Sequence, residues 1–418
     1  MHNLLHKIYY SKYTNTLVWF LAAMFYSLQM TLRILPIMMI DYFTQKFSMD
    51  AAEFGMLAGC YYLGYAGMQI PIGILLDKYH PRYVISGCIL ICISGILMTI
   101  YSETKIYAYL ARLLIGVGSA AGILGAVKSI DDFFPKKYSM FLGFTVFCGV
   151  FGAFYGGAPI GKSIKLFGIE ETLMLLVYIA LGLSIALLLL YRKSYSESKN
   201  HQSLSVMSII KSSLLNKRIW FIGFLGGLMV GPMGGFADTW GSKYLIEGKN
   251  IDSSAASDAI SLIFLGLGLG SSITGYIAQK FRSLSKLIAC MGIAQIIVML
   301  ILFSVEFEAP IYVYSLTLLM GILSSYQIVV FALANKLSTN HTVGVVTSLV
   351  NSMIMFFCFF FNYGIGAILK LLYNSLSKDR LVYNQEAFHG AFTLILFCIA
   401  LGIIGFISLI RKEKALKI

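Results

Sequence analysis

Long apolar segments recur along almost the whole chain, separated by short polar connections. Each segment is close to the 20 or so apolar residues that a helix needs to cross the hydrocarbon core of a bilayer. An open sheet would leave its edge amides unpaired in lipid, so the segments are predicted to be helices. The predicted spans are 16–42, 53–76, 83–102, 106–130, 141–163, 171–191, 219–245, 257–279, 286–305, 309–334, 342–372 and 388–410.

Composition supports an all-α membrane protein. Of the 418 residues, 58% are hydrophobic and only 12% are charged, whereas a soluble domain carries roughly a quarter charged residues. The first apolar segment is too long for the core of a cleavable signal peptide and contains Arg33, so it is predicted to be a retained span.

One longer, basic connection divides the chain near its middle. We predict an N-terminal six-helix bundle over 1–191, a basic linker over 192–218 and a C-terminal six-helix bundle over 219–418. Apolar linker residues recur at helical spacing, which favours an amphipathic helix on the membrane surface; a solvated linker is the alternative. These residues are Leu204, Met207, Ile210 and Leu214.

The two predicted halves repeat. Gly73 and Lys78 follow the second span, and Gly275 and Lys280 follow the eighth span at the same offset. An even number of spans in each half keeps the halves parallel, which is one of the known plans for transporters.

Three motifs give the chain a resemblance to the major facilitator superfamily. A Gly-x-x-x-Asp-Lys turn with a following Arg lies between spans two and three, although His80 replaces its usual second glycine. An Arg followed by small residues lies in span four, and the fifth span is rich in Gly and Pro. The matching residues are Gly73, Asp77, Lys78 and Arg82; Arg112, Gly116 and Gly118; and Gly149, Gly152, Gly156, Gly157 and Pro159.

Within that superfamily the chain is similar to a bacterial group of poorly characterised solute transporters, through Leu32–Pro36, Met68–Gly73 and Trp240-Gly241. The resemblance implies two six-helix bundles and multi-pass insertion in a bacterial inner membrane. Net charge is +13, and most Lys and Arg of the loops and tails fall on one side. The positive-inside rule therefore places both termini in the cytoplasm, and nucleic acid is not an expected partner.

Two charges inside spans are the main candidates for solute binding. An Arg at mid-helix is costly in lipid, so Arg33 must face a cavity or a partner, and a guanidinium suits a carboxylate or phosphate. The repeat offset places Arg33 opposite Gly235, one turn from Asp238. Asp238 could carry a proton, bind an ammonium group or neutralise Arg33, and a structural charge pair is the alternative for both residues.

Further polar residues complete the predicted cavity. The family uses the position of Arg112 near the central cavity or in proton coupling, and a structural bond to a carbonyl is the alternative. Polar side chains within spans either join helices or line the path. The candidates of this kind are Tyr65, Gln69, Gln327 and Asn351.

Charges near the span ends are candidates for gating. Asp77, Lys78 and Arg82 would bias transport if their contacts formed only when the cytoplasmic side is closed, with a static topology signal as the alternative. Asp41 and Lys243 could bridge the halves at the opposite end, or be independent solvated charges. The glycines of spans five and eight are expected to pack the halves together.

We therefore expect a secondary transporter that moves a small carboxylate-bearing or zwitterionic solute by alternating access, with protons as the coupling ion. The alternative is a transporter-like membrane sensor or partner protein without turnover. No Walker A loop, zinc-ligand cluster or nucleophile elbow is present, so we expect no enzyme activity, metal or cofactor. The expected partners are the solute and membrane lipid, and the expected state is a monomer.

Overall fold

The predicted apolar segments are helices in the computed structural model of the protein. The structure describes residues 12–192, 214–306, 309–338, 343–372 and 383–416, and these residues contain no strand. The surface helix predicted for the linker lies largely outside the described residues. The second half begins within the predicted linker, because α12 starts at Lys217.

The first half consists of six helical segments, three of them divided into consecutive shorter helices. The elements are α2 (Lys12–Ile34), η1 (Leu35–Met39) and α3 (Ile40–Phe47); α4 (Ala51–Lys78); α5 (Pro81–Tyr101); α6 (Lys105–Ser119) and α7 (Ala121–Phe133); η2 (Pro135–Lys137), α8 (Tyr138–Gly156) and α9 (Ala158–Phe167); and α10 (Ile169–Leu190). Helix α4 is continuous but contains a proline, Pro71.

The second half repeats this order. Its elements are α12 (Lys217–Gly235), the π-helical η3 (Phe236–Trp240), α13 (Gly241–Lys243) and the π-helical η4 (Tyr244–Gly248); α14 (Ser253–Lys280); α15 (Leu284–Ser304); α16 (Pro310–Ser324) and α17 (Tyr326–Asn335); α18 (Val343–Leu372); and α19 (Gln385–Leu416).

The element lengths confirm the internal repeat. Helices α4 and α14 have 28 residues each, α5 and α15 have 21 each, and α6 and α16 have 15 each. The same side-chain type begins both 28-residue helices: Asp50 accepts the N–H of Glu53, and Asp252 accepts the N–H of Ser254. An aspartate N-cap satisfies amides that the first turn leaves unpaired.

Ten helices among the described residues are long and apolar enough to cross a membrane, and the bent pair Met140–Gly156 and Ala158–Phe167 makes eleven. The remaining predicted segment is α4, which is 28 residues long. Tyr61, Tyr62, Tyr65 and Gln69 lower its apolar content, and all four are buried inside the protein. The fold is therefore an all-helical membrane fold of twelve helical segments in two parallel-repeat bundles.

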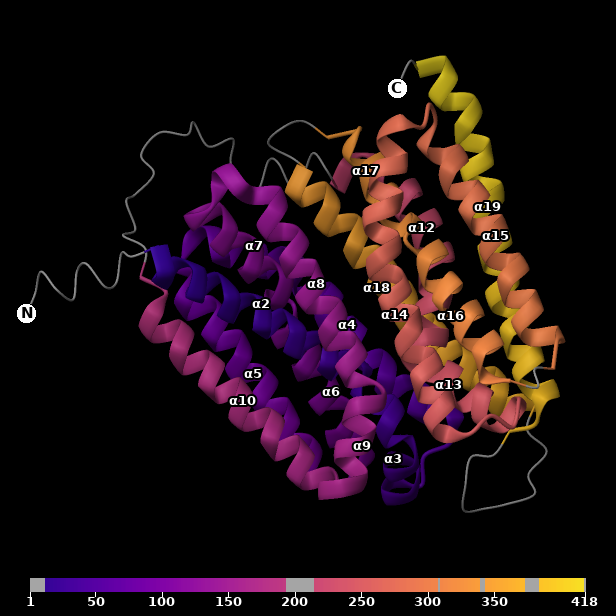
Figure 1. Cartoon of the computed structure of the whole chain (residues 1–418), viewed down its shortest axis with the longest axis horizontal. Helices are drawn as coiled ribbons and strands as arrows, with labels where there is room; N and C mark the ends of the chain where they lie inside the picture. Colours follow the sequence, from indigo (N-terminus) through magenta and orange to yellow (C-terminus); the bar gives the residue numbers. More distant parts are fainter. Residues whose placement is uncertain (1–11, 193–213, 307–308, 339–342, 373–382, 417–418) are drawn as a thin grey trace, which may run out of the picture.

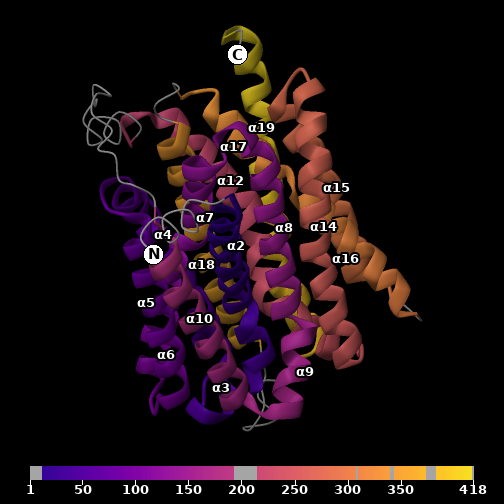
Figure 2. The ribbon, with the colours of Figure 1, turned by 60° about the vertical axis from the view of Figure 1, so that its left-hand side comes forward.

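The two halves lie side by side, with α2–α10 on one side and α12–α19 on the other (Figure 1). The long axes of their helices are roughly aligned with one another (Figure 2). We call the end at which α2 begins and α19 ends the terminal end, and the opposite end, which holds α3 and α9, the distal end.

Helices α4 and α18 join the halves near the distal end. A Cβ on Gly55 would lie 2.3 Å from the backbone oxygen of Asn362, and a Cβ on Gly366 would lie 2.3 Å from that of Ala51. Only a hydrogen at these positions permits such a close approach. Nearer the middle, the Ser352 hydroxyl donates to the Ala66 carbonyl at 3.1 Å.

Most glycines of α8 and α14 do not join the halves, which corrects the expectation for them. Gly152 faces Ser27 of α2, and Gly266 faces Leu318 of α16, so both pack within one half. Gly268, against Val150, and Gly157, against Ser261, are the ones that face the other half. Sequence spacing identifies a small-residue face without showing which helix covers it.

Candidate solute-binding site

A cavity of about 830 Å³ lies between the halves. At the terminal end its lining includes Asp77, Asp131 and Val343, which are exposed at helix ends. From there it runs to mid-molecule and stops at Arg33 and Asp238. Six of the seven predicted binding residues line it, namely Arg33, Tyr65, Gln69, Asp238, Gln327 and Asn351.

Arg33 and Asp238 form an ion pair that joins the two halves at the deep end of the cavity. The Nη2 atom of Arg33 lies 2.6 Å from Oδ2 of Asp238, and Nε lies 3.1 Å from the same oxygen. The Asp238 side chain is 2% exposed and that of Arg33 is 18% exposed. A buried charge of this kind needs a partner, because its transfer from water costs several kcal/mol, on the order of the gain from pairing.

Tyr62 completes this group, and sequence reasoning did not single it out. Its hydroxyl accepts from Arg33 Nε at 3.0 Å and donates to Oδ2 of Asp238. The Arg33 guanidinium also lies over the Tyr62 ring, 5.3 Å from its centroid. Tyr62 lies between Tyr61 and Tyr65 in sequence, so a tyrosine-rich stretch was the one available signal.

The second oxygen of Asp238, Oδ1, is buried and has no hydrogen-bond partner among the described residues. Asp238 lies in the π-helical turn η3, which follows Pro232 and two glycines of α12. Turns of this kind are rare and recur at functional sites. The site therefore holds an acceptor that the protein itself leaves unused.

Arg112 does not line the cavity, and it supports the helix that carries Arg33. Pro36 has no N–H, so it cannot donate to the carbonyl of Leu32 four residues earlier. Arg112 replaces that bond: Nη1 donates to the Leu32 oxygen at 2.8 Å and Nη2 to the Arg33 oxygen at 3.3 Å. Arg112 is 3% exposed, and these contacts match the structural alternative for this residue.

Tyrosines and amides form the wall next to Arg33. Gln29, one helical turn before Arg33, donates to the Tyr61 hydroxyl at 2.6 Å. Tyr61 and Tyr65 stack with ring centroids 6.0 Å apart. Gln69, one helical turn after Tyr65 on α4, and Asn351 of α18 line the cavity with them. Gln29 is a further lining residue that the sequence did not single out.

At the mouth of the cavity, Asp77 pairs within its own half. Its Oδ1 lies 2.8 Å from Nζ of Lys128 on α7. The Arg82 guanidinium lies over the ring of Tyr83, and the Lys78 ammonium lies over that of Tyr79. Asp77 lines the cavity, whereas Lys78 and Arg82 are not among its lining residues.

The distal end is packed shut by aromatic side chains. Phe54 of the first half meets Trp240 of the second edge-on, with centroids 5.9 Å apart, and Trp240 donates to the Asn362 carbonyl at 3.0 Å. Lys243 is 7% exposed and pairs with Glu247 at 2.6 Å. Asp41 is exposed at the same end, and the ion pairs of the described residues do not join it to Lys243.

Comparison with known proteins places this architecture in a family. The model of the Major Facilitator Superfamily matches residues 19–362. Over 113 residues the chain is 30% identical to the uncharacterized transporter YybO of Bacillus subtilis (strain 168), covering 26% of this chain and 26% of that protein. Over 146 residues it is 24% identical to the 4-hydroxybenzoate transporter PcaK of Pseudomonas putida, covering 35% and 33%.

The chain thus spans about a quarter to a third of the length of these relatives in the matched stretches. Among solved structures, it is similar to a bacterial homolog of the human lysosomal transporter Spinster in an inward-facing and occupied conformation. The TM-score is 0.74 at 15% identity, over 96% of this chain and 98% of that one, which shows a shared fold. Taken with the family match over most of the chain, these findings establish that the protein belongs to the Major Facilitator Superfamily, a family of transporters rather than enzymes.

Proposed function

We propose that the protein is a secondary transporter that moves a small organic solute bearing a carboxylate across the membrane by alternating access. The observation that carries this proposal is the cavity itself. Both halves line it, it reaches the surface at the terminal end, and it stops at an ion pair that joins the halves. A site between two parallel repeats near mid-membrane is where such transporters bind their cargo.

Arg33 supports an anionic cargo. Its guanidinium presents several donors in a fixed fork that matches a carboxylate, and its side chain remains 18% exposed toward the cavity. The relative PcaK is named for 4-hydroxybenzoate, which is itself an organic anion. We therefore assign Arg33 to the carboxylate of the cargo, with Tyr65, Gln69, Gln327 and Asn351 as further contacts.

Competition for Arg33 supports coupling to protons. Arg33 is paired with Asp238, so a cargo carboxylate has to displace the Asp238 carboxylate from the guanidinium. A proton on Asp238 removes the competing charge and releases Arg33 for the cargo. Oδ1 of Asp238 has no partner among the described residues and is free to accept the proton. One proton would then accompany each monovalent anion.

Closure of the mouth would require the terminal ends of α4 and α18 to approach one another. Asp77, Lys78 and Arg82 lie at that end of α4, and we assign them to this gate. In the open arrangement Asp77 is held by Lys128 of its own half. Following the positive-inside rule, we place both termini in the cytoplasm of a bacterial cell, so the cavity opens toward the cytoplasm.

Uptake into proteoliposomes tests the proposal. A thermal-shift screen of labelled organic acids, amino acids and dipeptides first identifies a ligand, because binding raises apparent stability by mass action. With an inward proton gradient, wild-type protein should accumulate that ligand. Arg33→Ala combined with Asp238→Asn should reduce accumulation at least about tenfold, the loss expected for one charge-assisted hydrogen bond.

Arg218→Ala is the matched control, because Arg218 is exposed and outside the cavity, and it should accumulate the ligand normally. Unchanged accumulation in the double variant would overturn the site assignment. Binding of a ligand without any accumulation would instead favour a sensor.

A further inference from the structure

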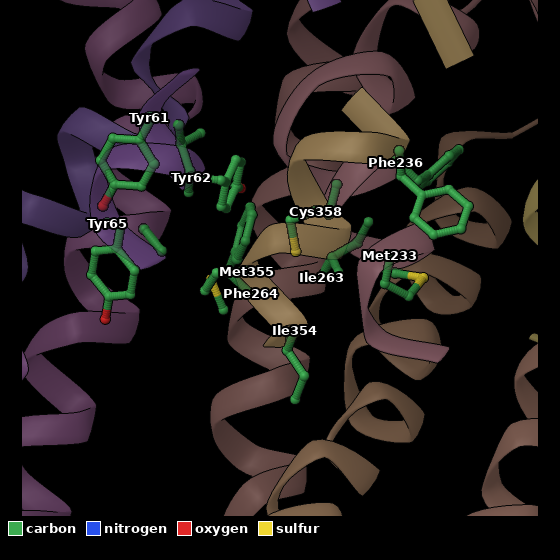
Figure 3. Packing of buried hydrophobic residues seen from close by; sticks show 14 of the residues in the cluster. Tyr61, Tyr62, Tyr65, Met233, Phe236, Ile263, Phe264, Ile354, Met355 and Cys358 are labelled. Atoms are coloured by element: carbon green, nitrogen blue, oxygen red, sulfur yellow. The ribbon is translucent and has the colours of Figure 1, made fainter. Parts of the chain in front are cut away.

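The two walls of the deep cavity differ in chemistry. The polar and aromatic residues of the first-half wall are Tyr26, Gln29, Arg33, Tyr61, Tyr65 and Gln69, with Met30 and Ile70 beside them. The second-half wall contributes the amides of Gln327 and Asn351 and a set of apolar and sulfur-containing residues, namely Met233, Ile263, Phe264, Leu267, Met355 and Cys358. Figure 3 shows the tyrosines of α4 on one side and Phe264, Met355 and Cys358 on the other.

This asymmetry constrains what can occupy the cavity once a carboxylate is bound at Arg33. The body of the solute must lie between the tyrosines and the apolar wall. Hydroxyl, amide or ammonium groups turned toward Met355 or Phe264 would find no hydrogen-bond partner, which makes their burial unfavourable. Thioether sulfurs and aromatic rings instead make favourable contacts with an aromatic body.

An α-ammonium group would need Asp238 as its charge partner, because Asp238 is the one carboxylate of the deep cavity among the described residues. Its Oδ2 already accepts from both Arg33 and Tyr62, and its unpaired Oδ1 is the atom that takes the proton in the proposed transport cycle. The other acidic residues of the lining, Asp77 and Asp131, lie at the mouth. A zwitterion would therefore have to share Asp238 with Arg33, and the proton that an anionic cargo requires on Asp238 would weaken that contact further.

Two unused polar atoms lie on the tyrosine side. Oε1 of Gln29 and Nε2 of Gln69 are buried without a hydrogen-bond partner among the described residues. Both belong to side chains that line the cavity on the mouth side of Arg33. They can receive a single polar substituent on the edge of a ring whose carboxylate is at Arg33.

We propose that the cargo is an aromatic monocarboxylate without an ammonium group, with its ring between the α4 tyrosines and the sulfur-rich wall. This inference rests on the proposed transport function and narrows its substrate class, since it excludes amino acids and small hydrophilic acids as preferred cargo.

A matched pair of solutes tests the inference directly. Phenylalanine and 3-phenylpropionate share a ring and a carboxylate and differ in the ammonium group, while lactate lacks the ring. In proteoliposomes with an inward proton gradient, 3-phenylpropionate should be taken up with at least about tenfold higher kcat/KM than lactate, as expected for burial of a phenyl ring. A preference of at least about tenfold is also expected over phenylalanine, because burial of its ammonium group without a free charge partner is costly.

Variants of the apolar wall connect that preference to the site. Met355→Ser should reduce the preference for 3-phenylpropionate over lactate several-fold, because it places a hydroxyl against the ring. Met140→Ser makes the same chemical change on the outer surface of α8, where Met140 is 55% exposed, and should leave the preference unchanged. A cooperative thermal unfolding transition in each purified variant serves as the check that it is folded.

The outcomes separate the two proposals. Uptake of phenylalanine or lactate at a rate equal to or above that of 3-phenylpropionate would overturn the aromatic cargo and leave transport of a carboxylate standing. Failure of folded protein to accumulate any carboxylate would overturn the transport proposal itself. An unchanged preference in Met355→Ser would show that the second-half wall does not contact the ring of the cargo, and would overturn the inference.

Discussion

At the scale of single residues, the position of Arg33 depends on two residues that never touch the cavity. Pro36 interrupts the hydrogen bonding of the first span, and Arg112 supplies the donor that Pro36 lacks. The break turns the chain into the short 3-10 segment η1, which begins at Leu35, two residues after Arg33. A costly buried cation in span four is therefore explained by a helix defect in span one.

This relation predicts that Pro36 and Arg112 are energetically coupled. Arg112→Met should lower thermal stability, because two buried carbonyls lose their donor, at about 1–3 kcal/mol for each unsatisfied group. Pro36→Ala returns an N–H at position 36 that can bond to Leu32 in an ordinary helix. Adding it to Arg112→Met should recover about 1 kcal/mol, measured as a coupling energy by denaturation of the four purified proteins in detergent.

Pro71→Ala, at the exposed proline inside α4, is the control and should show no coupling to Arg112→Met. Strictly additive effects of Pro36→Ala and Arg112→Met would contradict the role given to Arg112.

Individual site residues could be predicted from the sequence only where a charge inside a span or the internal repeat marked them. The cost of an arginine in lipid and the repeat offset brought Arg33 and Asp238 together, and the structure pairs them. Tyr62 and Gln29 carried no such signal, because a tyrosine or glutamine in a span is compatible with either packing or cavity lining. The partner of Arg112 is a backbone carbonyl, which sequence patterns do not identify.

At the scale of elements, an ion pair joins α18 to the start of α4 across the closed distal end. Nζ of Lys370 lies 2.7 Å from Oδ2 of Asp50. Burial by itself would raise the pKa of Asp50, but hydrogen bonds from Lys370 and from the Glu53 amide outweigh it and hold this pKa below its usual value. The pair is partly exposed and screened by solvent, so its contribution to the closed end is small.

We predict that Asp50→Asn destabilises the closed distal end without removing the helix cap, because Asn is also a good N-cap. Transport rates should change by up to about fivefold, and Lys370→Gln should give the same change with no additive effect in the double variant. Since the Asp50 pKa is lowered, its contribution is present above the ordinary value of about 3.9 and is lost only below it. The effect in uptake assays should therefore be equal at pH 7 and pH 5.

Lys105→Gln is the matched control for this prediction. Lys105 pairs with Glu53, which lies beside Asp50 on α4, but both residues belong to the first half. Loss of that pair should leave transport rates unchanged. An equal effect from Lys105→Gln, or a marked difference between pH 7 and pH 5, would show that the bridge between the halves is not the cause.

Helix order, approximate bounds and the two-fold repeat could be predicted from the sequence, because they depend on local hydropathy and on the Gly and Lys positions that recur at one offset after spans two and eight. The packing of the glycines could not. Gly152 and Gly266 carry the same small-residue signal as Gly157 and Gly268, yet the first two pack within a half and the last two between halves. Which face of a helix meets which neighbour depends on the whole bundle.

At the scale of the whole molecule, the arrangement is open at the terminal end and packed shut at the distal end. No sequence pattern specifies this, because a transporter must visit both arrangements with one sequence. The structure assigns the polar residues of spans one, two, seven, ten and eleven to a common cavity. It also gives the mouth and the closed end distinct residues, so that their accessibility can be measured separately.

Labelling of single cysteines tests which end faces the cytoplasm. In a chain whose seven natural cysteines are replaced by alanine, Ser348→Cys places a thiol on the cavity lining and Ser48→Cys places one at the exposed distal end. With the termini in the cytoplasm, a membrane-impermeant maleimide should label Ser348→Cys in inverted vesicles and Ser48→Cys in right-side-out vesicles.

Cargo adds a second expectation to the same experiment. Under the proposed transport cycle, a carboxylate cargo would occupy the cavity and favour closure of its mouth, so a saturating concentration should slow labelling of Ser348→Cys severalfold. Labelling of Ser48→Cys, outside the cavity, should not change and serves as the control for reagent access. The opposite sidedness of labelling would reverse the assigned orientation, whereas insensitivity of Ser348→Cys to a solute that the protein accumulates would show that this cavity is not its path.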